Sequence, residues 1–94
     1  ELLEETGLKA KTWKIILESQ VSNSVTDEIS ITYLATKLTQ HTPIPEETEE
    51  LAIKKLHISE AIEMALNGKI KDLISIASLL KVDYLLKNNL ILYT

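Results

Sequence analysis

The sequence predicts an α/β chain in which a helix end and β-strands precede two helices. Good helix formers fill residues 1–5. β-branched and aromatic side chains are frequent in residues 11–18, and the two faces of residues 28–38 alternate, as in strands. Apolar side chains recur at three-to-four spacing in 59–66 and 72–86, as in helices. The 94 residues, 45% of them hydrophobic, suffice for one small domain or part of one.

The first helix is expected to be only the end of a helix. Glycine readily adopts the left-handed backbone that closes a helix, so Gly7 is the predicted cap. The chain begins at Glu1 without an initiator methionine and without a helix-starting signal. We therefore interpret residues 1–94 as the C-terminal portion of a longer domain.

Strands are predicted on both sides of a polar loop at 19–27. The second strand, 28–38, alternates as a half-buried strand should. Its two faces would carry Ile29, Ile31, Tyr33 and Ala35 on one side, and Ser30, Thr32, Leu34 and Thr36 on the other. Pro43 and Pro45 then place a loop before the acidic residues 46–50, because proline disrupts both helices and central strands. A short third strand is expected at 51–58.

Two helices are predicted to follow. Ser59 is the expected N-cap of the first, and Asn67–Gly68 its end. The second runs from Asp72 to about Leu86. Its expected core-facing stripe has the spacing of one helix face and consists of Leu73, Ile76, Ala77, Leu80 and Tyr84.

Composition excludes several classes of partner. Ten basic residues against fourteen acidic ones give a net charge of −4, which argues against a nucleic-acid backbone as partner. No apolar run is long enough to span a bilayer, so no membrane partner is expected. The absence of cysteine excludes disulfides and thiolate metal sites, and it fits a cytoplasmic location.

Glu1, Glu4 and Glu5 are the first candidate site. Residues three and four apart share one face of a helix, so these carboxylates would project together. Carboxylate oxygens are the ligands that Mg²⁺ and Mn²⁺ prefer, and substrate phosphates commonly complete such sites. The alternative is an ordinary solvated helix face.

The run Glu1-Leu2-Leu3-Glu4-Glu5-Thr6-Gly7-Leu8 resembles the second half of the Nudix box, G-x5-E-x7-R-E-U-x-E-E-x-G-U, where U is aliphatic. It matches every defined position from the box's second Glu onward. The resemblance implies a Nudix α/β/α sandwich with a mixed sheet, to which this chain contributes the end of the Nudix helix, about three strands and two C-terminal helices. It assigns metal binding to Glu1, Glu4 and Glu5, with Glu5 also catalytic. The box's first Gly, its first Glu and its Arg would precede residue 1.

Two further segments resemble the ADP-ribose pyrophosphatases of that family: Ser24-Val25-Thr26-Asp27-Glu28 and Tyr33-Leu34-Ala35-Thr36-Lys37-Leu38-Thr39. In these enzymes a glutamate in the loop after the second segment acts as general base or as a further metal ligand. The resemblance favours Glu47 as base and Glu49 as ligand, with Glu46 and Glu50 as the next candidates.

The function implied is hydrolysis of a nucleoside diphosphate linked to another moiety, most directly ADP-ribose to AMP and ribose 5-phosphate. Mg²⁺ or Mn²⁺ is the implied cofactor and a homodimer the implied assembly. Three alternatives stay open: a nucleotide-sugar diphosphatase of the GDP-mannose type, a non-catalytic Nudix-fold binding protein, and an inactive fragment.

Isolated aromatic and imidazole side chains are assigned structural roles. His41 and His57 lack the close partners that metal-binding histidines have, so both are expected at the surface. Trp13 is expected in a core or an interface, and Tyr33 is expected to pack rather than to stack on a base.

Overall fold

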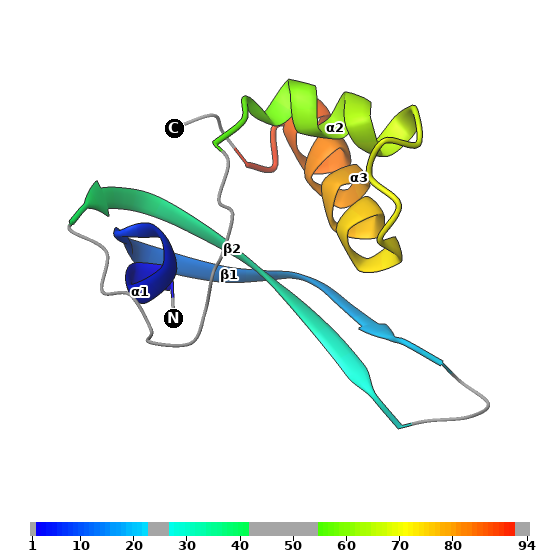
Figure 1. Ribbon diagram of the computed structural model, residues 1–94, viewed down its shortest axis with the longest axis horizontal. Coiled ribbons are helices and arrows are strands. Elements are labelled where there is room, and N and C mark those ends of the chain that lie inside the picture. Colours follow the sequence, from blue (N-terminus) through cyan, green and yellow to red (C-terminus); the bar gives the residue numbers. More distant parts are fainter. Residues whose placement is uncertain (1, 23–26, 42–54, 92–94) are drawn as a thin grey trace. The chain divides into compact units, whose positions relative to one another are not determined.

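The computed structural model describes residues 2–22, 27–41 and 55–91 (Figure 1). The order of elements in these residues is helix, strand, strand, helix, helix. Strands and helices thus occur together, and the α/β class is confirmed. The predicted third strand at 51–58 lies mostly outside the described residues. Its described end is not a strand, because Lys55–His57 form an irregular segment and Ile58 begins a helix.

Two strands form an antiparallel hairpin (Figure 1). Strand β1 spans Leu8–Gln20 and strand β2 spans Ile29–Gln40, so both predicted strands are confirmed and both are longer than predicted. Lys37 has φ 55°, a left-handed backbone that is typical of a bulge in a strand. The Val21 amide donates to the Glu28 carbonyl at 3.1 Å and closes the described ends of the β1–β2 connection.

The chain divides into two compact units, each described by itself. The first consists of Glu1–Trp13 and Ala35–Lys55. It contains helix α1, Leu2–Thr6, and the ends of the two strands that lie farthest from their connection.

The second unit consists of Lys14–Leu34 and Leu56–Thr94, and it holds the described core. Helix α2 spans Ile58–Leu66 and helix α3 spans Leu73–Lys87. The two helices pack against each other (Figure 1). Burial of Ile62 and Ala65 on α2 gives that helix the single apolar face expected of a short amphipathic helix.

A small apolar cluster joins the strands to the helices of the second unit. Ile16 on β1 lies with Val82 and Leu85 on α3, and each of these side chains is less than one-tenth exposed. Partly buried apolar side chains pack around them, namely Leu17, Leu34, Ile58, Leu86 and Ile91. Among the described residues of this unit, few therefore carry its hydrophobic stabilisation.

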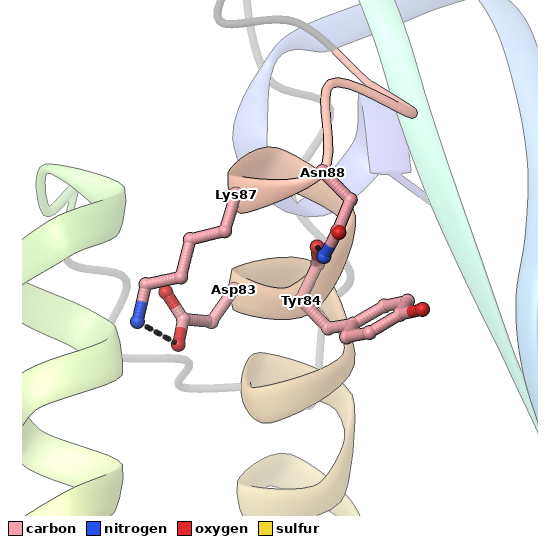
Figure 2. A network of polar contacts seen from close by, with 4 residues as sticks. All are labelled: Asp83, Tyr84, Lys87 and Asn88. Carbon is pink, nitrogen blue, oxygen red and sulfur yellow. Dashed lines mark hydrogen bonds and ion pairs between the residues drawn. The ribbon is translucent and has the colours of Figure 1, made fainter.

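The end of α3 is fixed by local polar contacts (Figure 2). Lys87 Nζ lies 3.0 Å from Asp83 Oδ2, one helical turn earlier, and Asn88 Nδ2 donates to the Tyr84 carbonyl at 2.8 Å. Lys87 is mostly exposed, so the ion pair contributes little to stability. Asn88 is the C-cap, which agrees with the predicted end of this helix.

The predicted core-facing stripe of α3 is wrong at Leu73, Leu80 and Tyr84, whereas its other two members, Ile76 and Ala77, are half-buried. Leu73 and Tyr84 are 73% and 56% exposed, and Leu80 is also exposed. Val82 and Leu85 are the buried residues of α3. Apolar side chains occur on every face of this helix, so their spacing did not distinguish the face that packs.

Strand β2 alternates as predicted, and the burial shows which of its faces is covered. Ser30, Thr32 and Leu34 are half-buried, whereas Ile29, Ile31 and Tyr33 are exposed. A hydrogen bond of 2.8 Å between Thr32 Oγ1 and Ser78 Oγ links this strand to α3.

Trp13 on β1 is 53% exposed to solvent when the described residues are considered. Its predicted place in a core is therefore wrong for this part of the chain. Its alternative place in an interface stays a prediction.

Candidate metal centre

Helix α1 ends as the sequence predicted. Gly7 has φ 76° and donates its amide to the Leu3 carbonyl at 2.9 Å. The Thr6 hydroxyl donates to the Leu2 carbonyl at 2.6 Å and accepts from the Leu8 amide at 3.0 Å. These bonds turn the chain sharply from α1 into β1, so the helix ends at Thr6, within two residues of Glu4 and Glu5.

Glu4 and Glu5 are the two predicted site residues that the structure describes. Both lie on α1, where Glu4 is half-buried and Glu5 is exposed. Neither carboxylate has a hydrogen bond or an ion pair with another of the described residues. Their oxygens are therefore available to a hard cation, and the donor chemistry fits Mg²⁺ or Mn²⁺.

The other predicted site residues lie outside the described residues. They are Glu1, Glu47 and Glu49, together with the next candidates Glu46 and Glu50. Within residues 2–22, 27–41 and 55–91, no group of three or more acidic, histidine or cysteine side chains could hold a metal ion. Glu4 and Glu5 alone would supply part of a coordination shell.

The turn at Gly7 also fixes the end of β2. The Gly7 carbonyl accepts from the backbone amide of His41, and Gln40 Nε2 approaches the same oxygen at 3.4 Å. Thr39 Oγ1 donates to the Lys9 carbonyl at 3.4 Å and lies 3.0 Å from His41 Nε2. His41, five residues before the acidic residues 46–50 in the sequence, is therefore hydrogen-bonded to the residue that directly follows α1.

Neither histidine contributes to a metal site among the described residues. His41 is exposed, as predicted, and it contacts Thr39. His57 is exposed as well, and it caps α2, since its Nδ1 accepts from the Ser59 amide at 3.2 Å. Ser59 is therefore not the N-cap that was predicted. Histidine is not one of the preferred capping residues, so the sequence offered no strong signal for this role.

A groove of about 700 Å³ lies in the second unit between β2 and the start of α3. The side chains that line it are mostly apolar or hydroxyl-bearing: Ser30, Ile31, Thr32, Tyr33, Ile70, Ile74, Ser75, Ser78 and Leu79. None of them has a carboxylate or a basic group. The groove therefore lacks the ligands that a divalent cation or a diphosphate requires.

Asp72 has the one resolved pKa shift among the described residues. Its carboxylate accepts from the Ser75 hydroxyl at 2.7 Å and from the Ser75 amide at 3.0 Å. These two hydrogen bonds, the side-chain bond first, lower the pKa of Asp72 below its ordinary value. The residue is the N-cap of α3, so the shift reflects helix capping rather than catalysis.

Comparison with known proteins gives one informative similarity. The chain is 35% identical over 85 residues to a protein named ADP-ribose pyrophosphatase from Mycobacterium tuberculosis. The match covers 87% of this chain but 41% of the relative, so the chain spans less than half of the relative's length. No family model matches the chain. None of the described helices is long and apolar enough to cross a membrane.

Proposed function

We propose that this chain is the C-terminal part of a Nudix domain that hydrolyses a nucleoside diphosphate linked to another moiety, with ADP-ribose as the first substrate to test. The similarity to an ADP-ribose pyrophosphatase supports this proposal. So do the eight residues of Glu1-Leu2-Leu3-Glu4-Glu5-Thr6-Gly7-Leu8. The homodimer expected from the sequence belongs to the same proposal.

The observation that carries the proposal is the geometry at the end of α1. Glu4 and Glu5 lie three and two residues before Gly7, whose carbonyl accepts a hydrogen bond from the His41 amide, five residues before the acidic residues 46–50. Glu47 and Glu49 are six and eight residues beyond His41, and six residues of extended chain span roughly 20 Å. The chain is therefore long enough for Glu47 and Glu49 to lie beside Glu4 and Glu5.

Each acidic residue has a role in this proposal. Glu1, Glu4, Glu5 and Glu49 would hold Mg²⁺ or Mn²⁺ through carboxylate oxygens. A bound cation neutralises the diphosphate and activates water. Glu47 would accept the proton of the attacking water, a task for which a carboxylate within hydrogen-bond reach is suited.

The test is release of AMP from ADP-ribose by the longer protein that we propose contains this chain. Activity with Mg²⁺ that disappears with a chelator would support a metal-dependent diphosphatase. A panel of nucleotide sugars such as GDP-mannose should be turned over more slowly than ADP-ribose. Preference for a nucleotide sugar would correct the substrate, and absence of turnover on all of them would contradict the proposal in favour of a non-catalytic Nudix-fold protein.

A further inference from the structure

The cap of helix α2 is an imidazole rather than a hydroxyl or a carboxylate. His57 Nδ1 accepts from the Ser59 backbone amide at 3.2 Å and lies 2.8 Å from Ser59 Oγ. An amide N–H can only donate, so Nδ1 must keep its lone pair, and the ring proton of neutral His57 must be on Nε2. This contact is therefore compatible with only one protonation state of the ring.

We infer that His57 is a pH-sensitive cap, so that protonation of its ring releases the first turn of α2. In the imidazolium form Nδ1 carries a proton and cannot accept. It can then donate to Ser59 Oγ, which already lies at hydrogen-bond distance, while the Ser59 amide loses its partner. The new positive charge also lies at the helix N-terminus, where the helix dipole opposes it.

The first turn of α2 is connected to the core of its unit. Ile58 directly follows His57 and packs against the cluster of Ile16, Val82 and Leu85. Release of the cap would loosen the turn that holds Ile58 in this cluster. A local change in protonation would thus reach the packing between α2 and α3.

Several charged residues lie on the segment that carries His57 and on the elements that pack against Ile58. On the segment itself the charged residues are Lys55, Glu60 and Glu63. On the elements that pack against Ile58, they are Lys14 and Glu18 beside Ile16 on β1, and Lys81, Asp83 and Lys87 beside Val82 and Leu85 on α3. Asp83 and Lys87 pair with each other (Figure 2). Carboxylates and lysines normally keep their charges between pH 8 and pH 5.5, whereas histidine is the side-chain type whose charge commonly changes within this interval.

The experiment compares thermal unfolding of the 94-residue chain and of H57N at pH 8.0 and pH 5.5. Asparagine caps helices well and does not titrate, so H57N should keep its cap at both values. We expect acidification to lower the melting temperature of the wild type by about 4–8 °C more than that of H57N. The matched control is H41N, which alters the other histidine of the chain and should respond as the wild type does.

A second measurement on the wild type covers the case in which H57N does not fold. The NMR signal of the Ser59 amide proton should shift with the same midpoint as the ring protons of His57. The Cα shifts of residues 58–61 should lose helical character over that titration. Equal acid responses in wild type and H57N, or a Ser59 amide that stays unchanged while the ring titrates, would overturn the inference.

Discussion

Two glycines end helices by the same backbone conformation. Gly7 follows α1 with φ 76°, and Gly68 follows α2 with φ 86°. Both positions were predicted from sequence, because glycine is the residue for which left-handed backbone carries no steric cost. At Gly68 an added Cβ would meet no atom within 4 Å.

This open space allows the backbone cost at Gly68 to be measured alone. We expect Gly68→Ala to destabilise the chain by about 1 kcal/mol, since alanine is strained at positive φ. Gly68→Asn should cost less, because asparagine tolerates the left-handed region. Urea unfolding of both variants checks this. Equal stability of Gly68→Ala and the wild type would contradict the assigned conformation.

Asp72 gives a prediction about acid stability. Its pKa is lowered in the folded chain from an ordinary value of 3.8. The stabilising contribution of the cap is therefore fully present above pH 3.8 and is lost as the pH falls through the lowered folded value. Asp72→Asn keeps an oxygen that can accept the capping hydrogen bonds, but it does not titrate. As the pH falls below 3.8, the helical circular dichroism of this variant should therefore change less than that of the wild type.

The control for Asp72 is Asp27→Asn, which removes an exposed carboxylate from the β1–β2 connection. Asp27 caps no described helix, so this variant should show the acid response of the wild type. Identical responses of Asp72→Asn and Asp27→Asn would count against the proposed role of the cap.

At the scale of single residues, the sequence indicated features with strong local chemistry. Gly7 and Gly68 act where their conformational preference places them, whereas Asp72, predicted as the first residue of its helix, is the N-cap that precedes it. His57 was missed as a cap, because Ser59 two residues later is by type the better capping residue. The cap that forms depends on where the helix begins, and the residue type alone does not fix that.

At the scale of elements, the positions of both strands and both C-terminal helices followed from spacing, whereas the buried faces did not. Helix α3 has apolar side chains all round, so its packed face depends on the strands and helix beside it. On β2 the apolar residues Ile29, Ile31 and Tyr33 are exposed while the hydroxyl of Thr32 bonds to α3. Which face of a helix or strand is buried depends on tertiary contacts, and the periodicity of the sequence does not describe these contacts.

A matched pair of leucines tests the assigned face of α3. Leu85 is 8% exposed and Leu73 is 73% exposed, although both belong to the same helix. We expect Leu85→Ala to cost about 2–4 kcal/mol, because it leaves a cavity in the cluster with Ile16 and Val82. Leu73→Ala should stay within about 0.5 kcal/mol of the wild type. Chemical denaturation checks both, and a larger loss at Leu73 would restore the originally predicted stripe.

At the scale of the whole molecule, the sequence predicted a site composed of distant parts, and the structure describes only some of them. Glu4 and Glu5 were recognisable because the box-like run is local. The hydrogen bond from the His41 amide to the Gly7 carbonyl is a long-range contact directly after α1, and no sequence spacing predicted it.

The most direct test of the proposed site compares Glu5→Gln with Glu63→Gln in the longer protein. Both changes replace one glutamate charge with a neutral side chain, but Glu63 is exposed on α2 and has no proposed role in catalysis. We expect Mg²⁺-dependent hydrolysis of ADP-ribose to fall about 100-fold or more with Glu5→Gln and to stay unchanged with Glu63→Gln. Equal activity of the two variants would contradict a metal-binding role for the end of α1.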